Sequence, residues 1–321
     1  MGRRRRRGLP INGWVIVDKP RDVTSTDVVA IVRRAFNAQK AGHGGTLDPL
    51  AEGILPIALG EATKTVPFAM DATKSYDFTI RWGEERTTDD LEGDVTVTSD
   101  KRPTTDEIVQ GLEQFTGLIS QVPPQFSAIK VDGARAYDLA RGGEDVALKA
   151  RPVHVIDLDY CGPLDDTHGA FRMTCGKGTY VRALARDLGR ALGSAATVAA
   201  IRRTRVGPFD ADRAISLDSL RDLDNSPPPE QALLPVETAL DGIPALALTG
   251  SDAQLVRNGG AVRITRLMAD QLAQSGLSGA TPPSDEDGAA PLVKLFDPQG
   301  RFLALASPVK GTVQPVRVFH C

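Results

Sequence analysis

The stretch KAGHGGTLDPLAEGILPIALGEATK, Lys40 to Lys64, places a single carboxylate, Asp48, on a glycine-rich turn directly before an apolar run. Glycine is favoured where a backbone takes a left-handed conformation or lies close to another molecule. The run ILPIAL is apolar enough to be buried, so it would anchor the turn in a hydrophobic core. An aspartate followed by proline is most often a turn residue. From the spacing alone, a structural role and a catalytic role for Asp48 both stay open.

The composition is that of an ordinary globular protein. The chain has 321 residues, of which 41% are hydrophobic and 25% charged, which allows more than one domain. No apolar run approaches the roughly 20 residues that a membrane helix needs. The basic start, MGRRRRRGLPINGW, has no apolar segment behind it, so a secretory signal is not expected. The cysteines (Cys161, Cys175 and Cys321) lack metal-type spacing and fit a reduced, cytoplasmic compartment.

The charges are segregated along the chain. The net charge is −3, which by itself argues weakly against a nucleic-acid partner. Residues 172–205 contain eight lysines or arginines and one acid, whereas residues 81–107 contain nine acids and four bases. Such segregation could give an acidic protein one positive face. The alternative is that both segments are solvated surfaces.

Hydrophobic periodicity predicts several elements. GWVIVDKP, residues 13–20, reads as a strand that ends at a proline. Residues 25–36 show helical spacing of apolar residues, with Ser25 or Thr26 as the expected helix cap. YDFTIRW, residues 76–82, alternates apolar and polar side chains, as a strand with one buried face does.

Residues 171–193 read as strand, glycine turn and helix. The expected helix carries an apolar stripe on one face. Arg182, Arg186 and Arg190 recur every four residues on another face, which we expect to be solvated. That expectation is weaker for Arg182, because the first helical turn lies beside the glycine turn and its free N–H groups.

The last quarter of the chain has a different pattern. Residues 220–240 read as an interdomain connection. Beyond them, residues 259–264, 292–306 and 315–319 predict the strands of a small all-β domain. A polar, low-complexity segment at about residues 275–290 is expected to be a mobile loop inside that domain.

Familiar signatures of other chemistries are missing from the sequence. GEATK lacks the glycine spacing of a phosphate-binding Walker loop, and no G-x-S-x-G nucleophile motif occurs. The four histidines form no metal-ligand pair. No metal site and no cofactor are therefore expected.

Several motifs, in order, resemble those of the TruB family of bacterial tRNA pseudouridine synthases. The segment from Gly42 to Lys64 resembles the catalytic aspartate motif of that family, and the resemblance covers nearly all of residues 13–240. The chain after about Pro244 more weakly resembles a PUA-type RNA-binding domain. The other matching segments are VDKPRDVTST, KSYDFTIRWGEERTTDDLEGD, PPQFSAIKVDGARAYDLAR, KGTYVRALARDLG and LLPVETAL.

The resemblance implies a fold and a domain plan. The expected class is α/β (α+β), with a pseudouridine-synthase fold: a central, mostly antiparallel sheet flanked by helices and loops, and a small C-terminal PUA-like β domain. The implied divisions are a basic disordered tail at 1–10, a catalytic domain at 11–243 with an RNA-gripping insertion at about 121–152, and an RNA-binding domain at 244–321.

The resemblance also implies the function and the site. The chain would convert uridine to pseudouridine at position 55 in the T-loop of tRNA, as a cytoplasmic monomer without a membrane anchor, a metal or a cofactor. Asp48 would be the nucleophile, Arg182 would pair with it and keep it ionised, and Tyr76 would stack on the target base. Attack at C6, attack at C1′ and a glycal route all stay open. The implied substrate-binding residues are Tyr180 and Ile201 in the base pocket, His43 against the opened RNA loop, Lys19 and Pro20 supporting the aspartate loop, and Lys64 and Lys130 as phosphate contacts.

Three positions depart from the family pattern. Asp22 stands where glycine is common, although aspartate tolerates left-handed backbone better than most residues. Phe126 and Thr197 stand where tyrosine and histidine are frequent. These two changes put local RNA contacts in doubt rather than the chemistry.

Two other classes of function were weighed against an isomerase. An RNA-folding protein without synthase activity would bind tRNA but form no product. A nucleoside hydrolase would release free uracil, but the motif offers one carboxylate where such enzymes use two.

Overall fold

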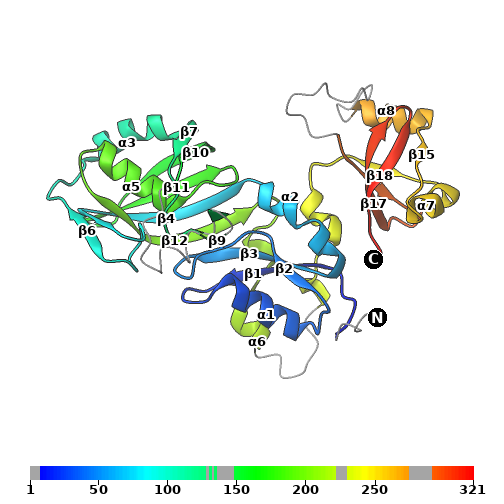
Figure 1. Ribbon diagram of the computed structural model, residues 1–321, viewed down its shortest axis with the longest axis horizontal. Helices are drawn as coiled ribbons and strands as arrows, with labels where there is room; N and C mark the ends of the chain where they lie inside the picture. Colours follow the sequence, from blue (N-terminus) through cyan, green and yellow to red (C-terminus); the bar gives the residue numbers. More distant parts are fainter. Residues whose placement is uncertain (1–7, 128–129, 132–133, 136–147, 222–229, 275–290) are drawn as a thin grey trace.

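The computed structural model describes residues 8–127, 130–131, 134–135, 148–221, 230–274 and 291–321. Most of the expected tail, half of the expected insertion and all of the expected loop at 275–290 lie outside these residues. The described chain forms a nine-stranded and a five-stranded sheet, with short two-stranded pairs beside them (Figure 1). Among the described helices, none has the length and apolarity to cross a membrane.

The nine-stranded sheet is the frame of the larger part of the molecule. Its strands run in the order β13-β1-β3-β12-β4-β11-β10-β7, and β2 pairs with β3 beside this path. Their bounds are Gly13–Lys19 (β1), Ala41–His43 (β2), Glu52–Leu59 (β3), Lys74–Trp82 (β4), Gly117–Gln121 (β7), Arg151–Pro163 (β10), His168–Cys175 (β11), Ala196–Val206 (β12) and Ala214–Ser216 (β13). The short pairs are Glu84–Arg86 (β5) with Val95–Thr98 (β6), and Lys130–Val131 (β8) with Ala134–Arg135 (β9).

The sheet is mostly antiparallel, as expected. Only β1 with β13 and β12 with β3 pair in parallel among its described strand pairs. The parallel pairing of β12 with β3 spans just two positions, Arg202 opposite Glu52 and Arg203 opposite Gly53. On its other side β12 pairs with β4 along its whole length, so this strand joins the two halves of the sheet.

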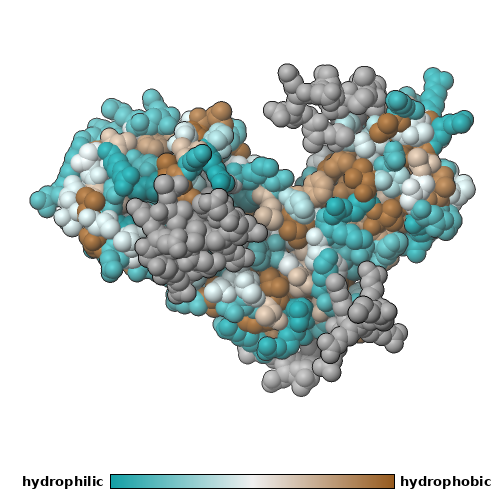
Figure 2. Space-filling model, viewed as in Figure 1, coloured by the Kyte–Doolittle hydropathy of each residue, from teal (hydrophilic) through white to brown (hydrophobic). Residues whose placement is uncertain are grey.

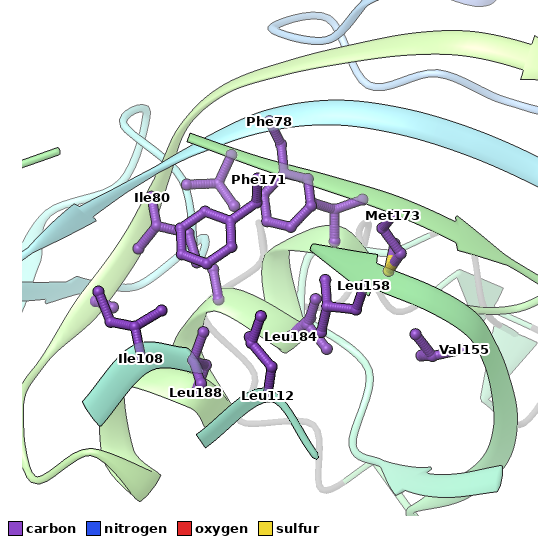
Figure 3. Packing of buried hydrophobic residues seen from close by; sticks show 14 of the residues in the cluster. Phe78, Ile80, Ile108, Leu112, Val155, Leu158, Phe171, Met173, Leu184 and Leu188 are labelled. Carbon is purple, nitrogen blue, oxygen red and sulfur yellow. The ribbon is translucent and has the colours of Figure 1, made fainter. Parts of the chain in front are cut away.

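Helices cover the sheet in two groups (Figure 1). The helices α3 (Thr105–Leu112) and α5 (Val181–Ala191) pack on the half that holds β4, β10 and β12. The helices α1 (Ser25–Ala35) and α6 (Leu217–Arg221) pack on the half that holds β1. Figure 3 shows the core of the first half, in which Phe78 and Phe171 face Leu184 and Leu188 of α5.

The strand and helix predictions in this part are confirmed. Phe78, Ile80 and Trp82 of β4 are buried, as the alternation predicts. The cap of α1 is Thr24, however, and not Ser25 or Thr26. Thr24 forms a capping box with Asp27, and each satisfies a free N–H group of the other. Ser25 instead bonds the backbone of Leu47.

The arginines of α5 are paired with acidic side chains, and of the three only Arg190 is largely exposed. Arg186 lies 2.8 Å from Asp89, and Arg190 lies 2.7 Å from Glu85. The basic helix and the acidic segment of residues 81–107 therefore neutralise each other in part. The segregation of charge along the sequence reflects this internal pairing, so the suggestion that it gives one positive face does not hold for these residues.

The second sheet contains the strands β14 (Ala245–Ala247), β15 (Val262–Arg263), β16 (Val293–Phe296), β17 (Phe302–Val309) and β18 (Thr312–Val318). The expected strands are present, but the domain is not all-β. The helices α7 (Gly250–Arg257) and α8 (Arg266–Gln274) add Val256, Met268 and Leu272 to its core.

The two parts share a hydrophobic cluster. Phe302, Leu305 and Phe319 of the C-terminal part are buried in the same cluster as Trp14 of β1. The described end of the expected interdomain connection also packs there, because Leu234 and Trp14 exchange two backbone hydrogen bonds of 2.8 Å. The outline is nevertheless indented between the two parts at the top of Figure 2, and hydrophilic residues border the larger part there.

The remaining helices are short. The α2 helix (Val66–Asp71) follows the 3₁₀ helix η1 (Gly60–Lys64), and further 3₁₀ turns are η2 (Glu113–Phe115), η3 (Ala211–Arg213), η4 (Glu230–Ala232) and η5 (Val236–Leu240).

Candidate active site

A cavity of about 260 Å³ lies beside the turn that carries Asp48. Five of the predicted site residues line it: Asp48, Tyr76, Tyr180, Arg182 and Ile201. They come from the turn before β3, from β4, from the start of α5 and from β12, which are far apart in the sequence. The fold therefore brings together the residues that the motifs singled out.

Asp48 and Arg182 form an ion pair at this cavity. Arg182 Nη2 lies 2.8 Å from Asp48 Oδ2. The arginine side chain is only 5% exposed, while that of the aspartate is 41% exposed. The carboxylate can therefore be reached from the cavity while its partner cation is held inside the protein.

Arg182 is fixed by the fold on its other sides. It donates hydrogen bonds to the carbonyl oxygens of Thr88 (2.8 Å) and Phe126 (2.9 Å), and it lies 3.6 Å from Asp90. Burial opposes its charge, but the negative charges around it, Asp48 first, outweigh burial and raise the pKa of Arg182. The guanidinium is thus a permanent cation whose position does not depend on Asp48 alone.

The aspartate turn is pinned from two sides. Ser25 Oγ donates to the carbonyl oxygen of Leu47 and accepts from its N–H group, both at 2.9 Å, which explains why Ser25 is not the helix cap. Lys19 is fully buried, and its ammonium donates to the carbonyl oxygen of Pro49 at 3.2 Å. These contacts hold the residues directly before and after Asp48.

Lys19 supports the loop from inside and is not exposed to a ligand. Its ammonium also donates to the carbonyl oxygens of Pro20 (2.8 Å) and Val23 (2.9 Å). Burial lowers its pKa to about 8, although the charge of Asp48 opposes this shift. Lys19 therefore contacts the aspartate turn directly, and Pro20 contacts the Lys19 ammonium through its carbonyl oxygen.

Asp22 takes the left-handed conformation that glycine commonly supplies. Its φ is 61°, and its N–H group donates to the carbonyl oxygen of Pro49 at 2.9 Å. Aspartate adopts this region more readily than most residues. The departure at this position therefore leaves the contact with the aspartate turn intact.

Two tyrosines from different elements line the cavity. Tyr76 on β4 is half-buried, and Tyr180 immediately precedes α5. The Gln121 side chain holds Tyr180 in place, because its amide accepts from the Tyr180 N–H group (2.8 Å) and donates to the Tyr180 carbonyl oxygen (3.1 Å). Burial raises the pKa of both phenols. Both tyrosines are therefore neutral hydroxyl groups near neutral pH.

Sequence reasoning missed Arg203, which lines the same cavity. It is 2% exposed and donates to the carbonyl oxygens of Ile54 (2.8 Å), Thr46 (3.2 Å) and Gly45 (3.1 Å). A signal was available in the sequence. Alternate residues of a strand share a face, so a strand that points Ile201 at the cavity also points Arg203 there.

His43 lies near this site without lining the cavity. It ends β2, and its Nδ1 accepts a long hydrogen bond (3.4 Å) from the Gly45 N–H group. Burial and the nearby charge of Arg203 lower the pKa of His43, so the neutral ring is favoured.

Lys64, the other expected phosphate contact, lies outside the cavity. Its ammonium bonds Glu61 and the carbonyl oxygen of Val318 (2.9 Å) and lies over the Phe319 ring. Lys64 thus ties η1 to the C-terminal domain. The backbone of Lys130 belongs to β8, but its side chain lies outside what the structure describes.

The other two departures have separate consequences. The contact of Phe126 with Arg182 runs through its backbone, so it does not need a tyrosine side chain. Thr197 is fully buried on β12, and its hydroxyl lacks a hydrogen-bond partner among the described residues.

The arrangement suits chemistry on a neutral ring bound in the cavity. It offers one accessible carboxylate, a buried cation that orients it, and two neutral phenols. Among the described residues, no group of three or more His, Cys, Asp or Glu side chains is placed to hold a metal ion.

Comparison with known proteins gives consistent matches. Residues 33–181 match the family described as TruB family pseudouridylate synthase (N terminal domain), and residues 182–241 match the tRNA pseudouridylate synthase B C-terminal domain. The chain is 51% identical to the tRNA pseudouridine synthase B of Caulobacter vibrioides, over 99% of each chain. It is also 51% identical to that of Bradyrhizobium diazoefficiens, over 98% of this chain and 88% of the relative.

Solved structures show the same fold. A chain from the crystal structure of a Cbf5-Nop10-Gar1 complex matches with a TM-score of 0.68 and 26% identity, over 96% of this chain and 84% of that one. A chain from an H/ACA RNP bound to a substrate RNA containing 2'-deoxyuridine matches with a TM-score of 0.69 and 22% identity, over all of this chain and 92% of that one.

Proposed function

The chain belongs to the TruB family of pseudouridylate synthases, and from this premise we propose that it acts on uridine 55 in the T-loop of tRNA. It is a tRNA pseudouridine synthase, an isomerase. The position in the tRNA and the nucleophile are the parts that we add. The resemblance of the motifs to the family supports the position, and the ion pair of Asp48 with Arg182 is the observation that carries the nucleophile.

The reaction exchanges one bond of the base for another. The bond from N1 of uracil to C1′ of ribose breaks, the ring turns, and a bond from C5 to C1′ forms. C5 loses its proton and N1 gains one, so the composition of the nucleoside does not change. Breaking the glycosidic bond needs a nucleophile or a stabilising charge beside C1′ or C6.

We assign that role to Asp48. Its carboxylate faces the cavity, and Arg182 holds it in one orientation from behind. A fixed carboxylate does not have to be reoriented during the reaction, which lowers the cost of reaching the transition state. Attack at C6, attack at C1′ and a glycal route are all compatible with this placement.

The base must leave the RNA stack to reach Asp48. Flipping costs a few kcal/mol, and least for a base in a loop. We propose that Tyr76 stacks on the flipped uracil, that Tyr180 and Ile201 line its pocket, and that His43 lies against the opened loop. A folded single-stranded loop is a target that RNA-binding proteins read by shape and stacking.

The domain roles follow from the same proposal. Residues 11–243 form the catalytic domain, with an insertion at about 121–152 that grips RNA and a phosphate contact at Lys130. Residues 244–321 form a PUA-like domain that extends the RNA surface. The protein works as a monomer in the cytoplasm.

The test is tritium release from C5 of uridine in an unmodified tRNA transcript, followed by mapping of pseudouridine. The wild-type protein should release tritium, and the product should map to position 55. The Asp48→Asn variant should bind the tRNA equally well and release none. The Asp77→Asn variant is the matched control, because Asp77 is an aspartate of β4 in an exposed ion pair with Arg172 (3.1 Å).

Three results would change the proposal. Product at another uridine would overturn the assigned position. Turnover by the Asp48→Asn variant would overturn the nucleophile. Tight tRNA binding without product from the wild-type protein would favour an RNA-folding function instead.

A further inference from the structure

Arg203 connects the two parts of the site that carry the proposed chemistry. Its donors reach the carbonyl oxygens of Gly45 and Thr46, three and two residues before Asp48. In the sheet it lies directly opposite Tyr76 of β4, so the two side chains share a face. The charge of the guanidinium also acts on the Tyr76 hydroxyl, because it opposes the rise that burial causes in the pKa of Tyr76. One buried cation thus contacts both the aspartate turn and the tyrosine strand.

The backbone around Arg203 leaves it little freedom. Arg203 lies opposite Gly53 of β3 on one side and opposite Tyr76 of β4 on the other. A Cβ atom on Gly53 would come within 2.2 Å of the Arg203 carbonyl oxygen, and the φ of Gly53 is +102°. Glycine is therefore required where β3 meets β12. This close approach places the arginine between the two strands.

The chemistry of arginine limits how Arg203 can act on the Tyr76 hydroxyl. A guanidinium has five N–H donors and no acceptor. Arg203 can therefore attract the Tyr76 oxygen but cannot accept its proton, so the hydroxyl proton of Tyr76 is left for a different partner. Both residues line the cavity, so that partner can be a ligand bound there.

On the basis of the proposed function, we propose that Arg203 is a positioning residue for catalysis. It holds the Tyr76 hydroxyl so that its proton is directed to the bound base, and it fixes the aspartate turn relative to that hydroxyl. Arg203 does not touch the substrate in this proposal; it acts through Tyr76 and through the backbone before Asp48.

The matched control is the neighbouring residue. Arg202 points to the opposite face of β12, is 39% exposed, and pairs with Asp18 (2.7 Å) and Glu52 (3.6 Å). Lysine at position 202 can keep one of these surface ion pairs. Lysine at position 203 keeps the charge, but its single nitrogen cannot reach three carbonyl oxygens and a hydroxyl group at once.

The first experiment measures single-turnover pseudouridine formation and tRNA affinity for Arg203→Lys, Arg202→Lys, Tyr76→Phe and the double variant Arg203→Lys with Tyr76→Phe. We expect Arg203→Lys to slow the chemical step by about 10- to 100-fold. Its tRNA affinity should stay within about twofold of the wild type, as expected for a group that leaves substrate binding unchanged. In the Tyr76→Phe background the same substitution should lower the single-turnover rate by a clearly smaller factor, because the effects of coupled residues are not additive. Arg202→Lys should be close to wild type.

A second measurement does not depend on activity. The chain has four tyrosines, so 3-fluorotyrosine incorporation gives few fluorine signals, and Tyr76→Phe assigns one of them. Arg203→Lys should shift the Tyr76 signal and leave that of Tyr160, in the core of the sheet, in place. Arg202→Lys should shift neither.

Two outcomes would overturn the inference. One is an unchanged rate or an unmoved Tyr76 signal in Arg203→Lys; the other is equal costs of that substitution with and without the Tyr76 hydroxyl. Neither outcome contradicts the proposed function. That proposal fails only if the wild-type protein forms no pseudouridine at position 55 or if Asp48→Asn is active. If the wild-type protein is inactive, the fluorine signal still decides whether Arg203 positions Tyr76.

Discussion

The guanidinium of Arg182 lies 2.8 Å from the Asp48 carboxylate, yet the arginine side chain is 5% exposed and that of the aspartate 41%. The pair is therefore asymmetric. The cation is bound to the protein through Thr88, Phe126 and Asp90, whereas the carboxylate keeps a free face toward the cavity. Such a pair can orient a nucleophile without blocking it.

Arg182→Lys should show whether the reaction rate depends on the orientation of Asp48 or only on the positive charge beside it. Lysine keeps the positive charge but cannot reach Asp48 and both carbonyl oxygens at once. We expect the single-turnover rate to fall by about 100-fold or more, because a small misplacement of a reacting group has an effect of that size. Affinity for tRNA should stay near wild type.

The control for this substitution is Arg190→Lys on the same helix. Arg190 is 58% exposed and pairs with Glu85 away from the cavity. Its rate should be unchanged. Equal losses in the two variants would indicate that helix stability, and not the geometry at Asp48, sets the rate.

Lys19 should make stability depend on pH in a definite direction. Its pKa is about 8 in the folded protein and 10.5 as the ordinary value. Between these values the unfolded chain holds the proton and the folded protein does not, so the contribution of Lys19 to the free energy of unfolding rises with pH. Below pH 8 both states hold the proton and the contribution is constant.

The measurement is urea unfolding of the wild type and Lys19→Met at pH 7.5, 8.5 and 9.5, which are about the range over which the linkage acts. The stability of the wild type relative to the variant should increase across the series. Lys40→Met is the control, because Lys40 is exposed and should show no trend. A flat difference for Lys19→Met would mean that the buried ammonium keeps its proton throughout.

Lys64→Ala should weaken the attachment of the C-terminal domain and not the contact with RNA. The variant loses the bonds from its ammonium to Glu61 and to the Val318 carbonyl oxygen. Limited proteolysis should cut the chain near the junction of the two domains faster than in the wild type. The slope of log affinity for tRNA against log salt should not change.

If the slope of log affinity against log salt is smaller by about 1 in Lys64→Ala, Lys64 contacts a phosphate of the RNA. Lys40→Ala serves as the comparison for a nearby exposed lysine.

Gly53→Ala should destabilise the protein where β3 meets β12. The new methyl group would meet the Arg203 carbonyl oxygen at 2.2 Å, and the φ of +102° is strained for any residue with a Cβ atom. We expect a loss of about 2–4 kcal/mol in the free energy of unfolding, measured in urea.

Gly42→Ala is the matched control in the same sheet, since nothing lies within 4 Å of the position its Cβ atom would take. A wild-type stability for Gly53→Ala would show that β3 and β12 can move apart.

Local pattern was enough for the elements that depend on it. The alternation of β4 and the apolar stripe of α5 predicted which side chains are buried, because periodicity reports which face meets the core. The prediction of the cap of α1 from local pattern was wrong. Thr24, Ser25 and Thr26 are all good caps, and the choice depends on Asp27 and on Leu47, which lies in a distant loop.

Short motifs in a fixed order were enough to identify the family, the aspartate turn and the residues that converge on it. The pairing of the charges, in contrast, could be seen only in the folded protein. Arg182, Arg186 and Arg190 looked like a solvated stripe, and they are partners of Asp90, Asp89 and Glu85. It also placed the Lys64 ammonium on the carbonyl oxygen of Val318 and brought Arg203 opposite Tyr76. The physical reason is that a charge is stabilised by whatever lies within a few ångströms, and for these residues the neighbours come from other strands and helices.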